Sequence, residues 1–115
     1  MANDYTQLAL AFANALMKGE FNKAYGFLSK QLKTEYSPEV LEQTYQNMVS
    51  YFLHPPCYCH VEVLMDDWAY PPKEECDLVW LYVSINADAD GEAITVIISE
   101  EQKHKVIRYI EWGRP

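Results

Sequence analysis

The sequence has little positive charge and few glycines, and each shortage argues against a class of function. Nine Lys and Arg residues stand against 17 Asp and Glu residues, which gives a formal net charge of −8 at pH 7. Binding to nucleic acid requires cations that neutralise phosphates, so this balance argues against a nucleic-acid partner and equally against an anionic membrane surface. The four glycines are isolated from one another, so no glycine-rich phosphate-binding loop is present.

Cysteines and long apolar runs are also scarce. Cys57, Cys59 and Cys76 make an odd number, which does not indicate a disulfide framework. No apolar run reaches the roughly 18 residues typical of a membrane-spanning helix, and the first residues carry no secretory signal. We therefore expect reduced thiols, a cytoplasmic location and no membrane partner.

The first half of the chain has the periodicity of helices. The 115 residues suit one domain, 1–115, and 50% of them are hydrophobic. Apolar residues recur at spacings of three and four, which predicts helices over residues 4–18, 20–32 and 38–53. Ser37 and Pro38 are placed to begin the third helix, because serine caps a helix and proline is tolerated at its first position.

The second half alternates with a period of two, which predicts strands over residues 57–69, 77–87, 93–99 and 105–112. Three helices followed by four strands predict an α+β fold, with the helices packed on one face of a curved four-stranded antiparallel sheet. The two middle strands are apolar on both faces, as in a sheet that is covered on both sides. A homodimer that covers the second face is therefore one expectation.

Three segments of the helical half carry a family likeness: Phe12–Phe21 with its Gly-acid-aromatic break, Ala24–Ser29, and the helix start Ser37–Glu39. Together with the order of elements, they resemble nuclear transport factor two-like domains, which have a cystatin-like fold. The resemblance implies a cone-shaped domain with a pocket between the helices and the concave sheet. It leaves the activity open, because that fold hosts enzymes, ligand-binding proteins, transport factors and toxin-neutralising immunity proteins.

Two patterns suggest metal ligands, and neither is complete. His54, Cys57, Cys59 and His60 lie close in sequence, but within a strand His60 points away from the face that the two cysteines share. Residues 86–91 match the start of a calcium loop, but position twelve of the loop lacks the required carboxylate. We therefore expect no metal site and no cofactor.

A general base is a weaker alternative. Glu62, Asp66, Asp67 and Asp77 lie on or beside expected strands, and a pocket carboxylate with a raised pKa can abstract a proton. None of them matches a recognisable catalytic signature, so no catalytic residue is assigned. An isomerase-like or dehydratase-like enzyme, or another small-ligand pocket protein, stays open as the alternative function.

The negative charge is concentrated in the strand-forming half. Residues 62–101 contain eleven Asp and Glu residues and one base, Lys73, together with several aromatic residues that are typical of protein interfaces. We therefore expect a non-enzymatic binding protein with a basic protein partner, most concretely an immunity protein that neutralises a toxin. The expected partner-binding residues are Asp66, Asp67, Trp68, Tyr70, Glu74, Glu75, Asp77, Asp88, Asp90 and Glu92.

Overall fold

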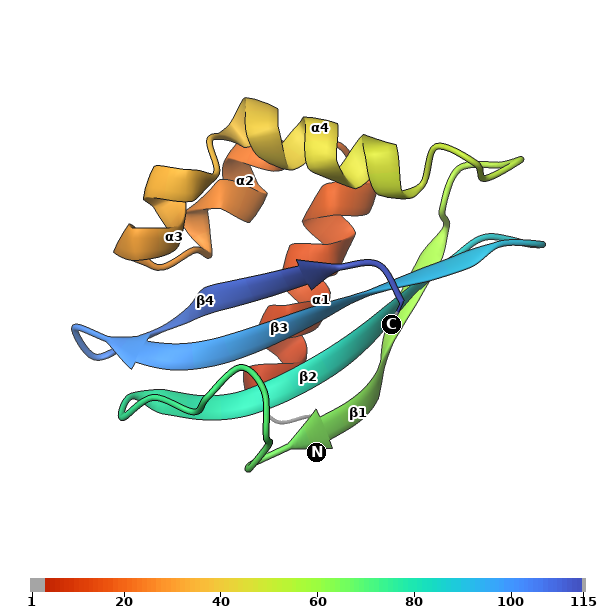
Figure 1. Cartoon of the computed structure of the whole chain (residues 1–115). Helices are drawn as coiled ribbons and strands as arrows, with labels where there is room; N and C mark the ends of the chain where they lie inside the picture. The colour runs from red at the N-terminus through yellow and green to blue at the C-terminus, as the bar shows by residue number, and fades with distance from the viewer. Residues whose placement is uncertain (1–3, 115) are drawn as a thin grey trace.

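Four helices precede four strands in the computed structural model, which describes residues 4–114 (Figure 1). The helices are α1 (Asp4–Met17), α2 (Phe21–Gly26), α3 (Lys30–Glu35) and α4 (Pro38–Met48). The strands are β1 (Tyr58–Met65), β2 (Asp77–Asn86), β3 (Gly91–Glu101) and β4 (His104–Trp112). Neighbouring strands pair antiparallel in the order β1-β2-β3-β4, so the predicted α+β class is confirmed.

The second expected helix is in fact two helices, because residues 27–29 pair with β4. The Ser29 amide donates to the Ile107 carbonyl at 2.8 Å, and the Ile107 amide donates to the Phe27 carbonyl at 2.9 Å. The Ser29 side chain then accepts a hydrogen bond from the Leu32 amide and caps α3. This short segment pairs with the outer edge of β4 at Ile107.

The third expected helix begins where the sequence predicts but ends at Met48, five residues before the expected end. Its start is capped by the Ser37 hydroxyl, which accepts from the Val40 amide. Beyond the helix, the chain turns toward the hairpin between β2 and β3. There, the Leu53 amide donates to Asp90 and the Tyr51 hydroxyl donates to the Gly91 carbonyl, both at 2.9 Å.

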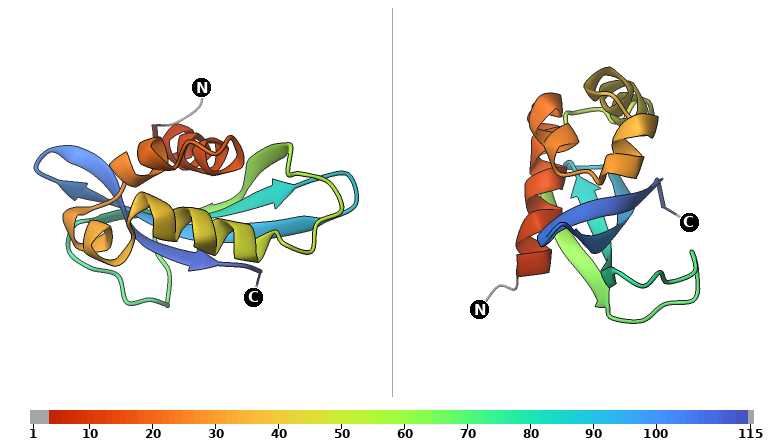
Figure 2. Two further views of the ribbon diagram at one scale, coloured as in Figure 1. Left: turned by 90° about the horizontal axis from the view of Figure 1, so that it is seen from above. Right: turned by 90° about the vertical axis from the view of Figure 1, so that its left-hand side faces the viewer.

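The helices lie on the inner face of the sheet (Figure 2). Buried side chains of the helices and the strands fill the interval between them. Phe12, Leu16 and Leu41 from the helices are at most 1% exposed, as are the facing strand residues Leu81 and Ile85. The central core therefore occupies the space in which the family resemblance places a pocket. None of the described helices is long and apolar enough to cross a membrane.

The outer face of the sheet is aromatic. Trp80 and Tyr82 of β2 stack with ring centroids 6.4 Å apart, and their neighbour Ile97 on β3 is fully buried. The first strand ends at Met65, earlier than predicted, and residues 66–76 form a loop that projects on the side opposite α1 (Figure 2). We call this segment the outer loop.

Candidate partner-binding groove

The structure divides the predicted acidic residues into two clusters at opposite ends of the sheet. The outer loop leads into the first residue of β2, Asp77, whereas Asp88, Asp90 and Glu92 lie at the hairpin that follows Asn86. A strand of ten residues spans about 33 Å. The predicted residues therefore do not form one continuous surface.

The hairpin cluster is largely engaged within the chain. Asp90 accepts the Leu53 amide, and Glu92 accepts the Tyr51 hydroxyl at 2.9 Å and the Arg114 amide at 3.1 Å. Asp88 is exposed. Two of the three acidic residues thus hold neighbouring segments to the hairpin, which leaves Asp88 as the most accessible carboxylate of this cluster.

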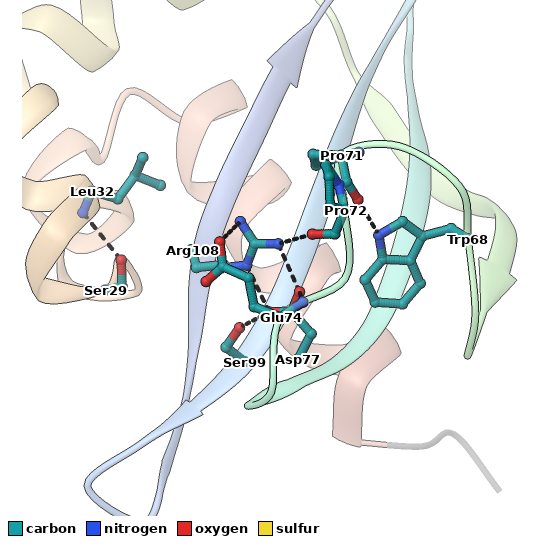
Figure 3. Close-up of polar contacts among 9 residues, drawn as sticks. All are labelled: Ser29, Leu32, Trp68, Pro71, Pro72, Glu74, Asp77, Ser99 and Arg108. Carbon is teal, nitrogen blue, oxygen red and sulfur yellow. Dashed lines mark hydrogen bonds and ion pairs between the residues drawn. The ribbon is translucent and has the colours of Figure 1, made fainter.

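The outer loop is held in shape by its own aromatic residue. The indole N–H of Trp68 donates to the Pro71 carbonyl at 3.0 Å (Figure 3). Lys73 lies over the Trp68 ring, with Nζ 5.2 Å from the centroid, and donates to the Asp66 carbonyl. Tyr70, in contrast, is 75% exposed. Trp68 is therefore part of the loop's internal packing, and Tyr70 is the aromatic residue available to a partner.

Asp77 lies at the base of the outer loop in a buried ion pair (Figure 3). Both carboxylate oxygens of Asp77 accept from the guanidinium of Arg108, from Nε and Nη2, each at 2.6 Å. The Ser99 hydroxyl and the Glu74 amide also donate to Asp77. Arg108 further donates to the Pro72 carbonyl at 3.3 Å, so the network fastens the outer loop to β2, β3 and β4.

This network fixes the charge of both partners. Burial alone would raise the pKa of the Asp77 carboxyl, but the hydrogen bonds and the positive charge of Arg108 outweigh burial and hold the pKa below its usual value. The hydrogen bond to Asp77 also raises the pKa of Arg108. Asp77 therefore stays ionised with its oxygens occupied, which makes it unsuited to accept a proton as a general base or to meet a partner.

A groove of about 310 Å³ opens beside this ion pair, between α3, β4 and the outer loop. Glu35 and Glu74 supply carboxylates, and Tyr36 and Tyr109 supply aromatic rings. Tyr36 is held in place by Trp112, whose indole N–H donates to the Tyr36 hydroxyl at 2.9 Å. The remaining lining residues are Ser29, Gln31, Leu32, Arg108 and Ile110.

The groove continues into a second hollow of about 250 Å³ that shares Ser29, Gln31, Glu74 and Arg108 with the first. Glu100 and Glu101 at the end of β3 add two carboxylates. Among the described residues that line the two hollows, Arg108 is the one cation, and it pairs with buried Asp77 and lies 3.4 Å from Glu74. The lining as a whole is therefore anionic.

Sequence patterns identified part of this groove. Glu74 and Asp77 were predicted, and Tyr70 lies close enough to Tyr109 to influence its pKa. Glu35, Tyr36, Glu100, Glu101, Arg108 and Tyr109 were not predicted to belong to a site. The alternation of β4 placed Tyr109 on a strand face, but the sequence holds no local signal that α3 packs beside β4.

Within residues 4–114, no three His, Cys, Asp or Glu side chains converge to hold a metal ion. The three cysteines are free, and burial raises the pKa of the Cys59 thiol.

The carboxylates and aromatic rings that line the groove favour binding of a cation. Comparison of the chain with protein-family models, curated proteins and solved structures finds no significant match.

Proposed function

We propose that this chain is a non-enzymatic binding protein whose groove accepts a lysine- or arginine-bearing segment of a basic protein. The observation that carries the proposal is the anionic lining. Four carboxylates, from Glu35, Glu74, Glu100 and Glu101, border the hollows, while the charge of Arg108 is already neutralised. Glu74 is shared with Arg108, whose Nη1 lies 3.4 Å from it. A cationic side chain would therefore meet an excess of negative charge that comes chiefly from Glu35, Glu100 and Glu101.

The shape and chemistry of the lining support a long cationic side chain. Leu32 and Ile110 offer apolar contact to an aliphatic stem, and the Tyr36 and Tyr109 rings offer cation–π contact to its charged end. Burial, together with nearby Glu111 and Tyr70, raises the pKa of the Tyr109 hydroxyl. The Tyr109 hydroxyl therefore stays neutral at physiological pH.

The most concrete form of the proposal is a cytoplasmic immunity protein that neutralises a basic toxin. The net charge of −8 would speed its association with such a partner and would disfavour acidic competitors. The space between the helices and the sheet is filled by Phe12, Leu16 and Leu81, which disfavours the isomerase-like alternative.

The binding proposal is tested by an NMR titration with a short peptide of alternating lysine and glycine. We expect chemical-shift changes at Glu35, Tyr36, Glu74 and Tyr109, and none with a glutamate–glycine peptide of equal length. The double variant Glu35→Gln/Glu74→Gln should bind the lysine peptide about tenfold more weakly, because it loses two carboxylates of the groove.

The matched control is Glu39→Gln/Asp88→Asn, which also removes two exposed carboxylates but leaves the groove intact. It should bind the lysine peptide as the wild type does. Equal weakening in both variants would show that the peptide responds to net charge alone and would contradict a located site. Rescue of growth when the chain is co-expressed with the product of an adjacent toxin-like gene would test the immunity role.

A further inference from the structure

The sheet has two edges, and the described chain covers only one of them. At β4, residues 27–29 exchange backbone hydrogen bonds with Ile107. At β1, the only ladder is the one with β2, and no other backbone hydrogen bond among residues 4–114 involves Tyr58–Met65. A strand whose outer N–H and C=O groups lack partners is a template for pairing with another strand.

The strand at the open edge also carries exposed apolar side chains. Among the residues that the structure describes, seven large hydrophobic side chains are exposed, and six of them fall between residues 51 and 70. Three of these six, Tyr58, Val63 and Leu64, lie on β1 and are 51%, 44% and 40% exposed. Side chains of this kind stabilise a strand only when something covers them.

The features that usually prevent edge pairing are scarce on this strand. Natural edge strands are commonly protected by lysine or proline, and Tyr58–Met65 contains neither. A bulge between Val61 and Val63 bends β1, but the strand continues to Met65 on its far side. The open edge is therefore suited to a partner strand.

We propose that β1 pairs antiparallel with β1 of a second copy of this chain, so that two sheets join into one. The polar side chains on the strand favour this occupant. His60 and Glu62 are the only titratable residues of β1 apart from Tyr58 and Cys59, and Nε2 of His60 lies 2.9 Å from Glu62. A two-fold axis near Val61 sets His60 of each copy beside Glu62 of the other, so the strand is complementary to itself.

Symmetry supplies a second reason to expect that β1 pairs with β1 of another copy. Pairing of the two β1 edges places the β4 edges, which residues 27–29 bridge at Ile107, on the outside of the joined sheet (Figure 1). The interface is the same on both copies, so the dimer is closed by its two-fold axis. The groove beside β4 lies at the opposite edge of the sheet, so the dimer does not depend on the proposed function and would present two grooves.

Size-exclusion chromatography with light scattering, from about 1 to about 200 μM protein, tests the proposal. The wild type should approach twice the monomer mass as concentration rises, while amide hydrogen exchange slows in β1. Leu64→Lys should weaken dimerisation at least about tenfold, because it buries a charge against the second strand. Val40→Lys is the matched control, since Val40 is 43% exposed on α4, and it should dimerise as the wild type does.

A second pair of variants tests the two-fold arrangement. His60→Glu places like charges across the axis and should weaken the dimer roughly fivefold, whereas His60→Lys should preserve or tighten it. A monomer at every concentration, a dimer unaffected by Leu64→Lys, or equal effects of the two His60 variants would overturn the proposal. Protection of β1 that appears only when a basic protein is added would assign the edge to that partner instead.

Discussion

Asp77 joins β2 to β3, to β4 and to the outer loop through its side chain. Its carboxylate is completely buried and accepts hydrogen bonds from Arg108, Ser99 and the Glu74 amide. A buried carboxylate is costly unless it is paired and its oxygens are satisfied, and here both conditions hold. The residue therefore belongs to the framework that positions the groove.

We predict that Asp77→Asn lowers the free energy of unfolding at pH 7 by about 3 kcal/mol, because it removes the buried counter-charge of Arg108 and leaves only the exposed Glu74 beside it. The folded-state pKa of Asp77 is depressed, so the unfolded chain binds the proton more readily. The wild type should begin to lose the stability that ionised Asp77 contributes as the pH falls below about 4, where aspartate in the unfolded chain is protonated. The loss should continue until the pH has fallen through the lower pKa that Asp77 has in the folded protein. Urea titrations from pH 7 downward should show the two proteins converging.

The control for that prediction is Asp66→Asn, which neutralises an exposed carboxylate of the outer loop. It should change stability by less than about 0.5 kcal/mol. If the free energies of unfolding of the wild type and Asp77→Asn differ by the same amount down to acid pH, the charge of Asp77 contributes nothing to stability.

The β3–β4 hairpin is the element with the least favourable local conformation. Its two-residue turn, Gln102 and Lys103, has φ values of 51° and 69°, although neither residue is glycine. Both residues in the left-handed region are characteristic of a type I′ turn, which matches the twist of the flanking strands. The turn is therefore set by the pairing of β3 with β4 against the preference of its own residues.

Replacement of Lys103 by glycine should stabilise the protein by about 0.5–1 kcal/mol, because glycine adopts a positive φ without the steric cost that lysine pays. Thermal unfolding followed by circular dichroism measures the change. Lys103→Ala removes the same charge but keeps the β-carbon, so it should give no such gain. An equal gain in both variants would attribute the effect to charge.

At the scale of the whole molecule, negative charge is distributed over both ends of the sheet and exceeds the positive charge. The net charge is −8, and the outer loop and the β2–β3 hairpin each carry exposed carboxylates. Repulsion among like charges opposes the compact state, and salt screens this repulsion. The buried Asp77–Arg108 pair is shielded from solvent and responds less to salt.

We therefore predict that the melting temperature rises by about 3 °C or more between about 20 mM and about 500 mM NaCl, as the Debye length falls below about 5 Å. Scanning calorimetry at one protein concentration measures it. The triple variant Asp66→Asn/Glu75→Gln/Asp88→Asn should show a smaller rise, because fewer charges repel. A melting temperature that falls with salt would mean that surface ion pairs outweigh the repulsion.

Local patterns determined the class of this fold and the starts of several of its elements. The Ser37 cap and Pro38 begin α4 where predicted. These signals depend on neighbours in sequence, so the chain alone carries them. The sequence also showed that the negative charge lies in the strand-forming half.

Only the tertiary structure decided how that charge is used. Asp77 and Arg108 are 31 residues apart, and nothing local indicates that they meet in a buried pair. The break between α2 and α3 likewise depends on Ile107, far along the chain. The predicted acidic residues are close in sequence, but the length of β2 separates them in space. Glu35 of α3 instead lines the same groove as Glu74. Contacts between distant segments depend on which faces the strands and helices bury, and that is settled only when the whole core packs.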